Sequence, residues 1–197
     1  MALISRFYTQ IVKWAGHRHA PYYLTGICIA ESAVLPFPPE ILLAPMTIAN
    51  PRSSVRFAFL ATVGSVIGAL VGYLIGDFAY EIIAQPIIEY FELTSHFDEV
   101  EMLFQEHGIW IIFISAIIPL PFKICTITAG MTEMAMLPFL LAAFMGRGIR
   151  FNLVTMLSRF GGKIIEEKIV KFLDKIELIL LGIVVLSIII YFAWGSI

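Results

Sequence analysis

The sequence is poor in charged residues. Asp, Glu, Lys and Arg make up only 14% of the 197 residues, whereas hydrophobic residues make up 59%. Soluble domains contain roughly 25% charged and 45–50% apolar residues, so this composition excludes an ordinary soluble protein and predicts an integral membrane protein. The length accommodates one membrane domain, residues 1–197, and leaves no room for a separate soluble domain.

Cysteine is scarce as well, and local signatures of most enzyme classes are missing. Cys28 and Cys125 have no CxxC or CxxH spacing, so we expect neither a disulfide framework nor a metal site. The chain contains no GxSxG, HExxH or Walker A motif. We therefore expect a protein that is not an enzyme and needs no cofactor, with no nucleic-acid partner. An intramembrane hydrolase assembled from scattered residues stays open as an alternative.

Few apolar segments are long enough to cross a bilayer. A transmembrane helix needs about 20 predominantly apolar residues. The segments that meet or nearly meet this length are 57–80, 134–157 and 178–195. The first 20 residues have no apolar core or small-residue cleavage site, so we expect no removable signal peptide.

Two further apolar segments, 22–49 and 109–131, are interrupted by Pro-x-Pro. Proline removes an amide donor and disfavours helix in the preceding residue, so each interruption should end a helix. We therefore predict two re-entrant helical hairpins, which enter the bilayer and turn back. The prolines that break them are Pro36, Pro38, Pro119 and Pro121.

The predicted fold is therefore all-α, a polytopic membrane domain with two hairpins and about three full transmembrane helices. A first repeat covers 20–80 and a second covers 108–160. Between them, 81–107 is acidic and only partly apolar, which predicts an interfacial helix or linker. Its acidic run is most simply a solvated face, with cation binding as the alternative.

Basic residues are missing from residues 57 to 122, and this gap orients the chain. Lys and Arg instead flank the first hairpin on both sides and follow the second repeat, whereas acidic residues fill the gap. Cytoplasmic loops carry an excess of Lys and Arg. We therefore expect a multi-pass protein of the bacterial inner membrane with a cytoplasmic N-terminus. Its first hairpin would enter from the cytoplasm and its second from outside.

The two interruptions resemble each other. Residues 32–41 (SAVLPFPPEI) align with 115–124 (SAIIPLPFKI) at five identical positions of ten. With the orientation above, the two copies have opposite directions in the membrane. This arrangement is an inverted repeat, which in many transporters places the binding site where broken helices meet. Irregular backbone at membrane depth needs protein or water around it, so we expect the hairpin tips to surround a polar cavity.

Ionisable residues lie close to both interruptions. Glu40 and Lys123 occupy equivalent positions, so pseudo-symmetry predicts opposite charges approaching one midplane, with Glu31 further back. Arg147 and Arg150, at i and i+3, share one face of the returning helix. Desolvation disfavours a charged carboxylate, so Glu31 and Glu40 are candidate proton-coupling residues. Arginine holds phosphate in a fork geometry, so Arg147, Arg150 and Lys123 are candidate anion-binding residues.

In combination, four motifs resemble the DedA superfamily, also called VTT-domain or SNARE-associated Golgi protein-like proteins, and within it the YqaA-like bacterial branch. They are ESAVLPFPPEILLAPM (31–46), GSVIGALVGYLIG (64–76), IPLPFK (118–123) and GRGIRF (146–151). The resemblance covers about residues 20–160. It implies facing re-entrant loops, a role in envelope homeostasis, and proton-dependent lipid transport, with undecaprenyl phosphate as one substrate. The family often has arginine in its second loop, where this chain has Lys123.

Several simpler interpretations stay open. Glu31 and Glu40 could only cap or pair structurally, Arg147 and Arg150 could lie at the cytoplasmic edge, and Lys123 could reach outward along its apolar stem. Glycines 64, 68, 72 and 76 predict close helix packing. The leading hypothesis is a proton-coupled transporter, flippase or scramblase for an anionic lipid head group or small anion. Its partners would be membrane lipids and protons, and homo-oligomerisation is left open. The alternative is a non-transporting scaffold or assembly factor.

Overall fold

The computed structural model describes residues 19–33, 38–90, 94–118 and 122–160. Every regular element in these ranges is a helix, so the all-α prediction is confirmed for the part of the chain that the structure describes. The elements are α2 (Ala20–Ala33), α3 (Glu40–Ala49), the 3-10 turn η1 (Pro51–Ser53), α4 (Ser54–Ala79), the π-helical turn η2 (Tyr80–Ala84), α5 (Gln85–Tyr90), α6 (Thr94–Ile117), α7 (Phe122–Met131) and a last helix, Met136–Phe160.

Three of the described helices are long and apolar enough to cross a membrane, namely Pro51–Ile82, Phe97–Ile117 and Met136–Phe160. The first and last lie where the sequence predicted spanning helices, at 57–80 and 134–157. Their outward faces carry large exposed apolar side chains, such as Phe59 and Ile75 on α4, and lipid would cover these. The predicted helix at 178–195 lies outside the described residues.

The region around residue 108 differs from the prediction. The sequence favoured an acidic linker at 81–107 followed by a half-helix from 109, but α6 continues without interruption through this point. A single glycine, Gly108, weakens a helix by only about 1 kcal/mol relative to alanine. The exposed position of Glu106 lets its carboxylate contact water, so an acidic stretch can belong to the same helix as the apolar one.

Each predicted proline break separates two helices. α2 ends at Ala33 and α3 begins at Glu40, whereas α6 ends at Ile117 and α7 begins at Phe122. Pro38 and Pro39 lead directly into α3, and a carboxylate in its first turn, that of Glu40, interacts favourably with the helix dipole. Pro36, Pro119 and Pro121 lie outside the described residues.

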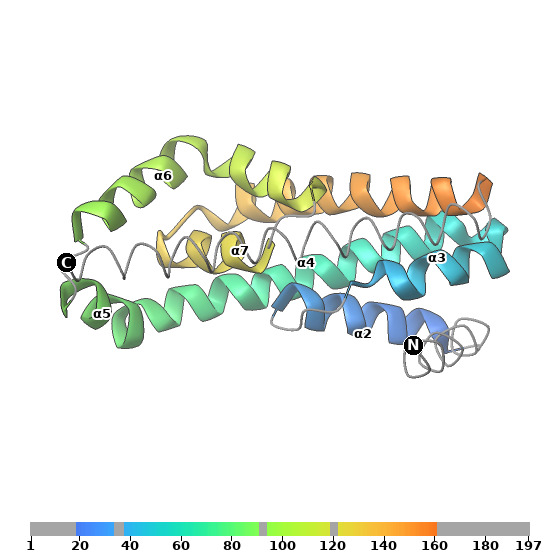
Figure 1. Cartoon of the computed structure of the whole chain (residues 1–197), viewed down its shortest axis with the longest axis horizontal. Coiled ribbons are helices and arrows are strands. Elements are labelled where there is room, and N and C mark those ends of the chain that lie inside the picture. The colour runs from blue at the N-terminus through green and yellow to red at the C-terminus, as the bar shows by residue number, and fades with distance from the viewer. Residues whose placement is uncertain (1–18, 34–37, 91–93, 119–121, 161–197) are drawn as a thin grey trace, which may run out of the picture.

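The two helix pairs approach the middle of the molecule from opposite ends (Figure 1). α2 runs inward from one end and α3 returns to that end, while α6 runs inward from the other end and α7 returns there. α4 and the last helix extend along most of the length between them. The end of α2 and the start of α3, and likewise the end of α6 and the start of α7, therefore lie towards the middle of the long axis (Figure 1).

α2 and α7 both pack against a row of glycines on α4. A Cβ atom added at Gly64 or Gly68 would collide with backbone carbonyls of α2, and one added at Gly76 would collide with the carbonyl of Ile127 on α7. At Gly72 it would meet the side chain of Thr126. The predicted packing role of this row is confirmed, because backbones approach this closely only where the side chain is hydrogen.

Buried apolar side chains form two clusters, one around α2 and α3 and one around α6 and α7. The first joins α2, α3 and the start of α4 to the end of the last helix, and Phe151 is fully buried in it. The second joins the middle of α4 to α6, α7 and the start of the last helix, with Phe139 fully buried in it. The last helix therefore crosses from one cluster to the other, and residues 147–150 lie along this passage.

Candidate functional site

Four ionisable side chains are buried where the two halves meet. Their exposed fractions are 0% for Glu40, 1% for Arg147, 6% for Glu31 and 7% for Arg150. Glu31 comes from the end of α2 and Glu40 from the first residue of α3, so the proline break presents both carboxylates on one side. The two arginines face them from one side of the last helix, as their spacing predicted.

Glu40 and Arg150 form a close ion pair. The Nε and Nη2 atoms of Arg150 lie 2.8 and 2.7 Å from Glu40 Oε1. The Nη1 atom donates a longer hydrogen bond, 3.4 Å, to the carbonyl oxygen of Ile118 at the end of α6. Arg150 therefore connects the first break to the second, although its two partners lie far apart in the sequence.

Glu31 and Arg147 form a looser pair. The distance between Arg147 Nη1 and Glu31 Oε2 is 3.5 Å. The same Glu31 oxygen accepts a hydrogen bond of 2.9 Å from Ser32 Oγ, which lies 2.6 Å from Ser65 Oγ on α4. A short polar chain thus leads from the carboxylate to the glycine-lined helix.

The donor nitrogens of the Arg147 guanidinium have no hydrogen-bond acceptors among the described residues. Its Nε, Nη1 and Nη2 atoms have no hydrogen-bond partner among the described residues, although the residue is almost completely buried. Its Cζ atom lies 4.2 Å from the ring centroid of Phe122 and 5.9 Å from that of Phe151. Contact with the ring faces and the charge of Glu31 attract the cation, but neither accepts its N–H groups in a hydrogen bond.

The formal charges of the two carboxylates and the two guanidinium groups sum to zero. This balance is needed because all four side chains are buried. Moving one ion into a protein interior costs several kcal/mol even after relaxation. Two carboxylates against two guanidinium groups offset much of this cost through attraction. A buried donor left without a partner still costs about 1–3 kcal/mol, more for a charged group, and Arg147 carries this cost.

Glu40 and Lys123, which occupy equivalent positions of the repeat, do not form an ion pair with each other. Glu40 contacts Arg150 of the last helix, at 2.7 Å. Lys123 lies in the first turn of α7 and is half-buried, and its backbone carbonyl accepts a hydrogen bond of 3.0 Å from Thr126. No ion pair between described residues involves its ammonium group.

Sequence reasoning missed the neutral members of the site. Phe122 contacts the Arg147 guanidinium, and Ser65 contacts Ser32, which donates a hydrogen bond to Glu31; neither Phe122 nor Ser65 was singled out. Ser32 was visible only as an aligned residue of the repeat. Arg147 and Arg150 are both buried against carboxylates, and their depth in the membrane stays a prediction.

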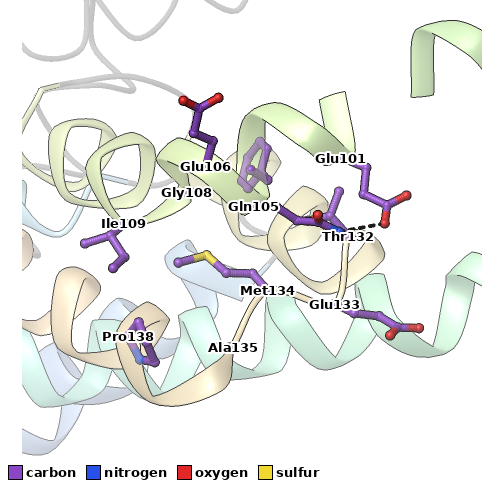
Figure 2. Close-up of a pocket in the computed structure, with 11 residues that line it drawn as sticks. Glu101, Gln105, Glu106, Gly108, Ile109, Thr132, Glu133, Met134, Ala135 and Pro138 are labelled. Carbon is purple, nitrogen blue, oxygen red and sulfur yellow. Dashed lines mark hydrogen bonds between the residues drawn. The ribbon is translucent and has the colours of Figure 1, made fainter. Parts of the chain in front are cut away.

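A separate hollow lies between α6 and the turn that follows α7 (Figure 2). It has a volume of about 350 Å³, and its lining includes Glu101, Glu106 and Glu133 but none of the four buried charged residues. Gln105 Nε2 donates a hydrogen bond of 2.9 Å to Glu101. The carboxylates of Glu106 and Glu133 point away from each other, so they do not converge on one point (Figure 2).

Metal ligation finds no support in the described ranges. No group of three or more His, Cys, Asp and Glu side chains is arranged there to hold an ion. Both cysteines are free, and Cys28 is buried in the first apolar cluster.

The comparison with known proteins agrees with this architecture. Residues 37–160, well over half of the chain, match the VTT domain. The chain belongs to the VTT-domain family. This result confirms the resemblance to the DedA superfamily, and the VTT domain includes Glu40, Lys123, Arg147 and Arg150 but begins after Glu31.

Relatives of this VTT-domain protein extend over almost all of it. An uncharacterised protein of Haemophilus influenzae is 34% identical over 192 residues, which cover 98% of each chain. An uncharacterised protein of Histophilus somni is 38% identical over 191 residues, 97% of this chain and 98% of its own length. No solved structure matches the chain significantly. Together with the three long apolar helices, the family identifies a membrane protein.

Proposed function

We propose that this VTT-domain protein transports an anionic lipid head group, or a small anion of the same chemistry, across the bacterial inner membrane, and that the proton gradient drives it. The observation that carries the proposal is the buried cluster of two carboxylates and two arginines, in which the Arg147 donors lack hydrogen-bond partners among the described residues. Charges buried at this cost in a membrane protein generally mark an ion or substrate pathway.

The lengths of α3 and α7, the second helix of each pair, support a re-entrant arrangement. α3 and α7 have 10 residues each. At about 1.5 Å per residue, each extends about 15 Å, which is half of the roughly 30 Å hydrocarbon core. Each helix therefore suffices to return from the midplane to one surface but not to cross. With the opposite approach of the two pairs in Figure 1, this supports an inverted repeat.

The charges at the two ends of the molecule support the proposed orientation. Arg52 and Arg56 are exposed near the start of α4, and Arg159 is exposed near the end of the last helix, at the same end of the long axis. Asp77 and Glu81 are exposed towards the opposite end. The positive-inside rule then places the basic end in the cytoplasm.

The chemistry of the cluster favours a phosphate-bearing substrate. Guanidinium groups bind phosphate through parallel N–H···O bonds, and in the part of the chain that the structure describes no hydrogen-bond acceptor occupies the Arg147 donors. A phosphate group on a lipid would place its acyl or prenyl chain in the membrane beside the protein. Undecaprenyl phosphate, which the DedA resemblance implies, is one such lipid. Glu31 and Glu40 are the groups of the cluster that can take up protons.

Translocation in proteoliposomes tests this function. Purified protein would be reconstituted with fluorescent phosphatidic acid labelled on an acyl chain, and label reaching the outer leaflet would be quenched by dithionite. We expect faster exchange than in empty vesicles, and acceleration by a pH gradient. A rate equal to that of empty vesicles with and without the gradient would favour the scaffold, which the close glycine packing of α4 also fits.

A further inference from the structure

The two buried ion pairs are not equivalent. Arg150 directs Nε and Nη2 to Glu40 and Nη1 to a backbone carbonyl. Arg147 has one carboxylate at 3.5 Å, and none of its three nitrogens has a hydrogen-bond partner among the described residues. All three Arg150 nitrogens are therefore engaged, although Glu40 Oε2 has no hydrogen-bond partner among the described residues, whereas every Arg147 nitrogen lacks such a partner.

We propose that Arg147 is the anion-binding residue, that the anion displaces Glu31 from it, and that Glu31 takes up a proton as it is displaced. This inference rests on the proposed function and specifies how its substrate and proton are coupled. Glu40 and Arg150 would stay paired throughout and hold the two breaks together.

Charge balance gives the reason for the coupling. In the structure, Arg147 and Glu31 sum to zero. A phosphate monoanion that joined them would leave one negative charge in excess at a buried position, at a cost of several kcal/mol. A proton that binds to a Glu31 oxygen restores neutrality, and the guanidinium then faces the phosphate alone. Release of the anion and of the proton reverses both steps.

The hydroxyl groups beside Glu31 suit both of its protonation states. Ser32 Oγ now donates to Glu31 Oε2 and lies 2.6 Å from Ser65 Oγ, where either hydroxyl can be the donor. When Glu31 carries a proton, it can donate to Ser32 Oγ while Ser32 donates to Ser65. The same chain of three groups therefore satisfies the carboxylate and the carboxylic acid, with hydroxyl rotation as the only change.

The remaining ionisable groups near the pair do not compete for this role. Glu40 on α3 is held by Arg150 of the last helix. Cys28, one turn before Glu31 on α2, adds no charge at neutral pH. α4 presents Ser65 and Thr62 on its buried face and has no charged residue between Arg56 and Asp77. On α7, Lys123 is half-buried and its ammonium group has no ion-pair partner among the described residues.

Calorimetry of the full-length protein in nanodiscs of neutral lipid tests the proposal. Two permanent monoanions serve as probes: dimethyl phosphate, a free phosphodiester, and dihexanoyl phosphatidylglycerol, which carries the same group on a lipid. Titration in buffers of different ionisation enthalpy measures the protons taken up. We expect about one proton per anion bound in the wild type. Binding of both probes indicates a site for the phosphate group itself, whereas binding of only the second indicates a lipid site.

Two variants and a control decide the assignment. Glu31→Gln should bind the probe without proton uptake, and Arg147→Leu should bind it about 10- to 100-fold more weakly. Glu106→Gln, outside the cluster, should leave the proton count unchanged. Anion binding without proton uptake in the wild type, or uptake that persists in Glu31→Gln, would overturn the proposal. If Arg147→Leu does not fold, the proton count of Glu31→Gln decides alone. A wild type that binds in this way but moves no lipid in vesicles would refute the transport function and leave the coupling standing.

Discussion

Arg150 holds Glu40 through two nitrogens, Nε at 2.8 Å and Nη2 at 2.7 Å from the same carboxylate oxygen, across 110 positions of sequence. The pair joins the first residue of α3 to the last helix. Because Arg150 also reaches the carbonyl of Ile118, it connects both helix breaks. This single side chain therefore positions the two halves of the site.

Removal of Arg150 should destabilise the protein. Arg150→Ala leaves the Glu40 carboxylate buried without its partner, and breaking a buried pair in this way costs about 3–5 kcal/mol. Thermal unfolding in detergent, followed by tryptophan fluorescence, measures the change. The double variant Glu40→Leu/Arg150→Met removes both charges and should recover most of the lost stability. Equal stability of Arg150→Ala and the wild type would show that the pair is not structural.

Neutralisation of Glu31 should remove the pH dependence of transport. Glu31→Gln keeps the shape of the side chain and can still accept a hydrogen bond from Ser32, so we expect folded protein in the membrane. It has no titratable proton, so a pH gradient should no longer accelerate translocation of the labelled lipid. The vesicle assay with and without the gradient measures this. A gradient response equal to that of the wild type would assign the coupling to another residue.

The glycine row on α4 should tolerate no side chain. In Gly76→Ala the new methyl group would collide with the carbonyl of Ile127, and in Gly68→Ala with the carbonyl of Ile29. Overpacking of this kind costs about 1–3 kcal/mol. Gly26→Ala on α2 is the matched control, since nothing lies within 4 Å of its added Cβ. It should stabilise the helix by up to about 1 kcal/mol. A Gly76→Ala protein as stable as Gly26→Ala would contradict the close approach of α4 and α7.

Labelling of single cysteines tests the proposed orientation of the protein in the membrane. With Cys28 and Cys125 replaced by alanine, single cysteines at the exposed positions Ser95 and Arg56 should react with a membrane-impermeant maleimide from opposite sides of the membrane. Arg56→Cys should be protected in intact spheroplasts and Ser95→Cys should be labelled, because the basic end of α4 is expected in the cytoplasm. Labelling of both positions in intact spheroplasts would reject this topology.

Much of the fold could be predicted from local sequence. Apolar length located α4 and the last helix to within a few residues, and the prolines located both breaks, since these properties act on neighbouring residues. The start of α6 could not be predicted in this way. The acidic stretch before Gly108 and the apolar stretch after it were predicted as separate elements. In the structure both belong to one continuous helix, α6.

The candidate site was predicted as a set of residues but not as an arrangement. Glu31, Glu40, Arg147 and Arg150 stand out because charges are rare in apolar sequence, and the structure brings all four together. Pseudo-symmetry related Glu40 to Lys123, but it did not indicate that the ion-pair partner of Glu40 is Arg150. An alignment of the two repeats shows which positions are equivalent. It does not show which side chains touch, because a residue of another helix, here Arg150 of the last helix, can be the partner.

By itself, the sequence determined that this protein lies in a membrane, that its inner helices are interrupted, and which few ionisable groups accompany the interruptions. Hydrophobic composition and proline chemistry act locally, so a linear reading captures them. Only the tertiary structure decided that Arg150 is held by Glu40 while Arg147 retains donors without hydrogen-bond partners among the described residues. The physical reason is that buried electrostatics depend on ångström distances between helices remote in sequence, and those distances are set by how close α4, through its glycines, lets its neighbours approach.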